Sequence, residues 1–175
     1  ASVYRRTRVD NACDNTYTDC VTLKLQQELK QAKPFRRVEE EAFLSVMRTA
    51  AVLDHAMSQA LKPHGVTPTQ YNVLRILRGA GAAGLCRNEV GDRLVTAVPD
   101  VTRLLDRMEQ TGLIVRQRGA ADRRYVTTRL SKKGSALVDT LDATVAGVQA
   151  ELLGHVDKRS LKGLVELLGA VRDRS

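Results

Sequence analysis

The residues best suited to binding chemistry in this chain are cations gathered in one short stretch. Residues 116–133 hold seven Lys or Arg against one Asp, a net charge of +6 over eighteen residues. By contrast, residues 38–115 hold eight cations against nine acids, and residues 134–175 hold five against six. Seven cations so close together would repel one another without a polyanion nearby, so the pattern favours a polyanion site. The alternative interpretation is a loop of solvated arginines.

Residue types that support catalysis or metal binding are sparse. The cysteines and histidines lie far apart, without metal-ligand spacing, and no Ser-His-Asp or Cys-His arrangement is present. They are Cys13, Cys20, Cys86, His55, His64 and His155. The sequence therefore predicts no enzyme, no catalytic residue, no metal site and no cofactor. Three cysteines also favour a reducing compartment over a disulfide framework.

The elements that must position the cations are mostly helical. Aromatic residues make up 3% of the chain and Trp is absent, so Leu, Val, Ala and Met must build the core, which favours helices. From Val38 to Leu61 apolar residues recur at steps of three and four, which predicts a long helix ended by residues 63–65. Thr67 and Gln70 around Pro68 predict a capped start for the next helix. Glycines 79, 81 and 84 then predict a loop.

Further along the chain, the spacing of apolar residues changes from a helical period to that of strands and back. A short helix is expected near Arg87–Leu94 and another from about Val98 to Thr111, ended by Gly112. Residues 113–118 and 123–130 read as two strands around a turn. Helices are expected at 135–153, capped from Ser131, and at about 160–172. The predicted fold class is mainly α with a small β-hairpin wing.

Three short helices followed by a hairpin is the order of a winged helix-turn-helix. A helix fits the major groove of DNA, and a hairpin reaches the adjacent backbone or minor groove. We expect Thr102 and Arg103 to contact base edges. Asp100 could accept a bond from a cytosine amine, cap its helix or tether an arginine. The predicted DNA-binding set is Thr67, Thr69, Gln70, Arg87, Pro99, Asp100, Thr102, Arg103, Arg107, Arg118, Asp122, Arg123 and Arg124.

Several linked motifs follow one another along this part of the chain: residues 65–74 (GVTPTQYNVL), 101–109 (VTRLLDRME), 112–116 (GLIVR), 122–124 (DRR) and 130–134 (LSKKG). In this order they resemble the MarR (multiple antibiotic resistance regulator) family of bacterial transcription regulators. The resemblance implies a homodimer in which each winged helix contacts half of a palindrome. It also implies that Arg124 enters the minor groove and that Arg103 or Arg107 pairs with Asp122.

The same resemblance implies an effector site. Many members bind small, often phenolic, anions in a cleft between the dimer helices and the DNA-binding lobe. Residues that could border such a cleft, or equally pack in the core or the dimer, are Arg48, His55, Met57 and Tyr71. The peroxide-sensing branch has a cysteine early in its first long helix, and residues 43–61 contain none.

The predicted organisation has three parts. Residues 1–37 form an extension, partly disordered, with a short helix near 23–33. Residues 38–64 and 135–175 supply dimerisation helices, because they carry more apolar surface than a small winged domain can cover. Residues 65–134 form the winged helix-turn-helix.

The predicted function is a dimeric, cytoplasmic transcription regulator, a ligand-responsive repressor that binds double-stranded DNA at a palindromic operator. The alternative is a winged-helix module that binds proteins without an operator. No run approaches the ~20 apolar residues of a membrane span, and no secretory signal is visible.

Overall fold

The structure is a computed structural model that describes residues 25–118 and 126–173. The chain divides into two compact units, Ala1–Val52 and Leu53–Ser175, and the helix α2 (Val38–Leu61) runs across their boundary. In the first unit, residues 25–28 are helical. The described part of the helix expected near 23–33 ends at residue 28 and not at 33, because Lys30 adopts a left-handed conformation (φ 52°) that helical residues do not take.

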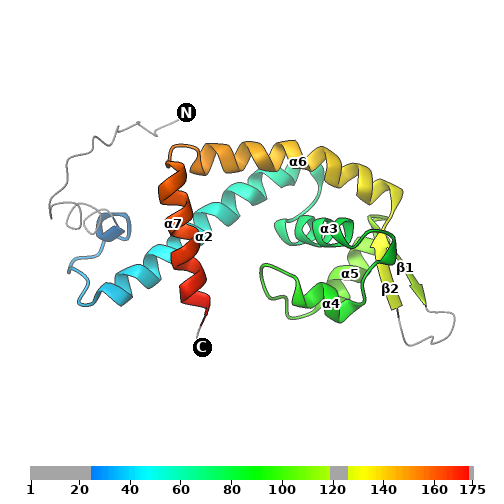
Figure 1. The fold of residues 1–175 in the computed structure, drawn as a ribbon, viewed down its shortest axis with the longest axis horizontal. Helices are drawn as coiled ribbons and strands as arrows, with labels where there is room; N and C mark the ends of the chain where they lie inside the picture. The colour runs from blue at the N-terminus through cyan, green and yellow to red at the C-terminus, as the bar shows by residue number, and fades with distance from the viewer. Residues whose placement is uncertain (1–24, 119–125, 174–175) are drawn as a thin grey trace. The chain divides into compact units, whose positions relative to one another are not determined.

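The second unit contains the end of α2 and all later elements. In chain order these are η1 (Lys62–His64), α3 (Pro68–Ala80), η2 (Gly81–Ala83), α4 (Arg87–Asp92), α5 (Val101–Gln110), β1 (Ile114–Arg118), β2 (Val126–Leu130), α6 (Lys132–Leu153) and α7 (Lys158–Arg172) (Figure 1). The strands pair antiparallel, with Ile114 opposite Leu130 and Arg118 opposite Val126. The predicted class, mainly α with one hairpin, is confirmed.

Local capping signals set where several helices begin. At α3, the Thr67 hydroxyl accepts a bond from the Gln70 backbone N–H at 3.2 Å, and the Gln70 side chain accepts from the Thr67 N–H at 2.9 Å. The helix α6 begins after Ser131, whose hydroxyl accepts from the Gly134 N–H at 2.9 Å. Both starts follow from short polar side chains that satisfy otherwise unpaired backbone donors.

Three predicted boundaries are wrong in detail. Gly79 lies inside α3, and the chain turns only at Gly81 (φ 59°) and Gly84 (φ 67°). The helix α4 ends at Asp92 and not at Leu94. The helix α5 begins at Val101 and not near Val98, because proline disfavours a helical conformation at the residue before it and Asp100 is extended as the cap.

The core of the second unit lies among α3, α4, α5, the hairpin and the first half of α6. The side chains with the least exposure belong to all of these elements and to the end of α2: Leu61, Val73, Leu74, Leu77, Val90, Leu105, Met108, Ile114, Val138 and Leu141. A packed core of this kind fixes α5 and the hairpin relative to each other. The helices α3, α4 and α5 and the described part of the hairpin therefore pack around one core.

The helix α7 is built differently, because none of its residues is buried. Its exposed apolar side chains are Leu164, Val165, Leu167 and Val171, and α2 likewise exposes Phe43, Val46, Met47 and Val52. These are the helices that the sequence assigns to dimerisation.

Among the described residues, no helix is long and apolar enough to cross a membrane.

The hairpin joins α6 at a close backbone approach. A Cβ atom built at Gly134 would overlap the carbonyl oxygen of Leu113, the residue before β1. That carbonyl accepts a bond from the Ser131 N–H at 3.1 Å, and the Ser131 hydroxyl donates to the Gly112 carbonyl at 2.6 Å. Glycine is therefore required at position 134 for reasons of space.

Candidate nucleic-acid interface

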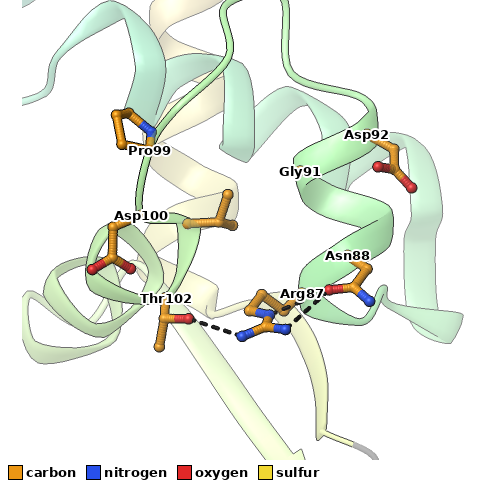
Figure 2. Close-up of a pocket in the computed structure, with 8 residues that line it drawn as sticks. Arg87, Asn88, Gly91, Asp92, Pro99, Asp100 and Thr102 are labelled. Atoms are coloured by element: carbon orange, nitrogen blue, oxygen red, sulfur yellow. Dashed lines mark hydrogen bonds between the residues drawn. The ribbon is translucent and has the colours of Figure 1, made fainter.

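A cleft of about 390 Å³ lies between α4 and the start of α5. Figure 2 shows Arg87 of α4 reaching across it toward Thr102 of α5. Arg87 Nη1 donates to Thr102 Oγ1 at 3.3 Å, and Nε and Nη2 of Arg87 donate to Asn88 Oδ1 at 3.3 and 3.2 Å. The structure thus brings together two residues that the sequence placed separately in the DNA-binding set. Pro99 and Asp100, also in that set, line the same cleft.

The side of α5 that faces away from its buried residues presents Arg103. Its side chain is 84% exposed, and its Nε lies 3.5 Å from Asp100 Oδ2. Asp100 Oδ1 accepts from the Arg103 backbone N–H at 2.9 Å, so Asp100 caps α5 and tethers its arginine, two of the roles expected for it. Arg107 Nε donates to the Arg103 carbonyl at 3.4 Å. An exposed arginine on a rigid helix is the commonest specific contact to guanine.

Three cations of residues 116–133 donate hydrogen bonds to acceptors within the protein. The expectation that all seven would repel one another unless a polyanion were nearby is therefore too simple. Lys133 Nζ donates to the Thr111 carbonyl at 2.8 Å. Arg129 donates to the Ala82 carbonyl at 2.7 Å and to Gln117 Oε1 at 2.9 Å. Within residues 25–118 and 126–173, Arg118 and Lys132 make no side-chain hydrogen bond or ion pair, and Arg118 at the end of β1 remains available for a phosphate.

Arg116 is the third cation of residues 116–133 that is paired within the protein. The sequence did not predict it as a site residue. Its Nε donates to Glu109 Oε2 at 2.8 Å and its Nη2 to Asp106 Oδ1 at 2.6 Å, while its backbone N–H donates to Glu109 Oε1 at 3.1 Å. The Glu109 carboxylate, followed by Asp106, raises the pKa of the Arg116 guanidinium. We call Arg116, Asp106 and Glu109 the Arg116 cluster. It joins α5 to β1.

The remaining predicted DNA contacts divide into two groups. At the start of α3, the Thr67 and Gln70 side chains bond to each other's backbone, and Thr69 is half-buried. The residues Asp122, Arg123 and Arg124 lie outside the described part of the chain, so their roles and the pairing of Asp122 with Arg103 or Arg107 stay predictions.

The four residues proposed to border an effector cleft have different surroundings. Arg48, in the first unit, has its Nε 3.8 Å from Glu28 Oε2. His55 is exposed, whereas Met57 packs against the core. Tyr71 is buried, and its hydroxyl lies 3.4 Å from Asp142 Oδ1. Core packing, the alternative expected for these residues, is confirmed for Met57 and Tyr71.

Ion pairs fasten α3, the first helix of the predicted DNA-binding domain, to α6. Arg78 Nη1 lies 2.8 Å from Asp142 Oδ2 and 3.1 Å from Asp139 Oδ1, and Arg78 Nη2 donates to Asp142 Oδ1 at 3.1 Å. The hydrogen bond from Arg78 lowers the pKa of the Asp142 carboxyl. Two-point contact of a guanidinium with one carboxylate also fixes geometry.

Acid should therefore weaken this connection. A carboxyl whose folded pKa lies below its unfolded pKa stabilises the fold at pH values above the unfolded pKa, about 3.9, and this stabilisation disappears as pH falls through the folded value. We expect Asp142→Asn to unfold with a shallower loss of stability below about pH 5 than the unsubstituted chain. The measurement is urea unfolding between pH 3 and 7. Asp92→Asn is the control, and an equally shallow profile for it would contradict this role of Asp142.

Metal chemistry has no support from the described residues, among which no three His, Cys, Asp or Glu side chains group as a metal site. What remains is an exposed arginine and a threonine on α5, next to a strand that ends at Arg118, whose side chain has no partner among the described residues. These groups donate hydrogen bonds to base edges and phosphates. The arrangement suits binding to a nucleic acid.

Comparison with known proteins agrees with a nucleic-acid interface at this site. Residues 64–124 match the model of the MarR family. The uncharacterized HTH-type transcriptional regulator YkoM of Bacillus subtilis is 31% identical over 116 residues, covering 66% of this chain and 70% of that protein. This relative is thus a transcriptional regulator.

Solved structures share the fold. A MarR transcription factor from Planctomyces limnophilus is 31% identical, with a TM-score of 0.61, and the match covers 78% of this chain and 98% of that one. BpsR of Bordetella bronchiseptica, whose DNA binding is regulated by 6-hydroxynicotinic acid, superposes with a TM-score of 0.71 at 21% identity, over 82% of this chain and 100% of that one. The family match, the 31% identical relative and the winged helix-turn-helix fold agree, and this chain belongs to the MarR family of DNA-binding transcription regulators.

Proposed function

We propose that this protein is a homodimeric repressor that binds a palindromic operator, with one winged helix-turn-helix on each half-site. The observation that carries the proposal is the arrangement of α5. Its Leu104, Leu105 and Met108 are buried, whereas Thr102 and Arg103 are exposed. A helix held rigidly by one face and polar on the other is what major-groove contact requires.

The hairpin adds affinity without sequence preference. Arg118 is exposed at the end of β1, and it has no partner within the described residues. A cation in this position neutralises a phosphate and releases a counterion, whatever the base sequence. We therefore assign base recognition to α5 and a backbone contact to Arg118.

Substitution should separate the two roles. We expect Arg103→Ala to weaken binding to a selected operator by about 10- to 100-fold, with little effect on a scrambled duplex, because it removes a base contact. Arg118→Ala should weaken both duplexes about equally and lower the slope of log affinity against log salt by about two, one for each subunit.

The operator for this experiment is first selected from random duplexes with the unsubstituted protein. Arg36→Ala, which removes an exposed arginine outside the winged helix-turn-helix and the dimerisation helices, is the control and should bind as the unsubstituted chain does. Equal losses on both duplexes from Arg103→Ala and Arg118→Ala would reject the assignment. Binding that does not weaken with salt would reject DNA as the partner.

Regulation by a small aromatic anion forms the second part of the proposal. It is supported by family membership and by BpsR, which responds to 6-hydroxynicotinic acid. An effector acts by binding more tightly to the conformation that does not fit the operator. A thermal-shift screen of hydroxylated aromatic acids, followed by operator binding with each hit, tests this part. A hit must both stabilise the protein and weaken operator binding.

A further inference from the structure

The helix that contacts bases in the proposed function also carries two acids on the same side as Thr102. Asp106 and Glu109 follow Thr102 by four and seven residues, so the three side chains share one face of α5. Their side chains are 42% and 38% exposed. Two carboxylates in this row would repel the phosphates of a duplex that Thr102 contacts.

Arg116 occupies a position that reduces this repulsion. Its side chain is only 25% exposed, and both carboxylates lie within hydrogen-bond distance of it. The same residue is on β1, and its backbone N–H also donates to Glu109. One arginine therefore contacts the helix and belongs to the hairpin.

We propose that Arg116 is a positioning residue for DNA recognition, which offsets one of the two negative charges of Asp106 and Glu109 and holds α5 against β1. This inference rests on the proposed function and extends it. Arg116 itself does not contact DNA. It makes the electrostatic potential at α5 less negative where DNA would approach. It also keeps Arg103 on α5 and Arg118 on β1 at a fixed spacing.

The alternative is an ordinary surface ion pair that contributes to folding alone, and such pairs contribute little. The two roles differ in their response to salt and to removal of the acids. Repulsion between carboxylates and phosphates is screened as salt rises, whereas a loss caused by misfolding is not. Repulsion also disappears when the acids become amides.

The test uses three variants and the selected operator. The first is Arg116→Gln, the second is Asp106→Asn with Glu109→Gln, and the third combines all three substitutions. Amides match the shape of the acids, and the oxygen of a glutamine at position 109 can still accept from the Arg116 N–H. Urea unfolding of each variant is measured beside DNA affinity.

We expect Arg116→Gln to bind the operator about tenfold more weakly at low salt, and the difference to shrink to less than about threefold near 0.3 M salt. The combined variant should recover to within about threefold of the unsubstituted protein. The acid-to-amide pair alone should bind at least as tightly as the unsubstituted chain.

Arg118→Gln is the matched control, because Arg118 lies on the same strand and is not paired with the two acids. Adding Asp106→Asn and Glu109→Gln to Arg118→Gln should not restore the binding lost with Arg118. If Arg116→Gln does not fold, Arg116→Lys replaces it. Lysine keeps the charge but not the fork, so its salt dependence should stay close to that of the unsubstituted protein.

Unchanged binding by Arg116→Gln overturns the inference while leaving the proposed function intact. So does a loss that is independent of salt and not recovered in the combined variant. Failure of the unsubstituted protein to select any duplex overturns the proposed function, and the inference with it.

Discussion

Replacing Gly134 with alanine is expected to destabilise the protein by about 2–3 kcal/mol, because the added methyl group would overlap the Leu113 carbonyl oxygen. A flexible side chain could rotate away, but a carbonyl in the main chain cannot. The start of α6 must therefore separate from the residue that precedes β1, and the bond from the Ser131 N–H to Leu113 must lengthen. Urea unfolding measures the loss.

Gly79→Ala is the matched control. Gly79 is helical like Gly134, but it is exposed, and a Cβ atom there would meet nothing within 4 Å. Alanine is favoured over glycine inside a helix, so this change should stabilise by roughly 0.5–1 kcal/mol. If Gly134→Ala stabilised the protein as well, the close approach between α6 and the hairpin would be disproved.

The second large effect concerns α7. We expect Val165→Asp to convert the proposed dimer to a monomer, because Val165 is 67% exposed on a helix without buried residues and a partner must cover it. An unpaired carboxylate buried between two copies is strongly unfavourable. Light scattering at several protein concentrations measures the oligomeric state.

Operator binding should fall in parallel. Two linked half-site contacts exceed one by about 100-fold or more in affinity. Val165→Thr, which keeps the shape without a charge, should remain a dimer and bind normally. If the Val165→Asp protein stays dimeric, α7 does not form the dimer interface. If it is monomeric and binds the full operator normally, operator binding does not require two winged helix-turn-helix domains.

Local signals in the sequence predict much of this fold. The Thr67–Gln70 box, Ser131 before α6 and Gly112 after α5 act within four residues, so the neighbouring sequence determines them. Gly79 misleads for the same reason, because a glycine in the chain looks like a break although α3 continues through it to Ala80.

The site was less predictable where it depends on pairing across elements. Which acids Arg116 meets depends on how the hairpin folds back on α5, seven and ten residues away. The spacing of Asp106 and Glu109 on one helix face was visible and could have suggested a nearby cation. The contact of Arg78 with Asp142 spans 64 residues and carries no local signal.

The bond from Arg87 also occupies one of the two lone pairs of the Thr102 hydroxyl oxygen. A guanidinium has only donors, so the oxygen acts as acceptor there and the hydroxyl hydrogen points elsewhere. Toward a duplex, Thr102 keeps that hydrogen for purine N7, guanine O6 or thymine O4, and it keeps its second lone pair for a base amine. The arginine on the neighbouring helix thus orients the hydroxyl that would meet an operator base and leaves it able to donate or to accept.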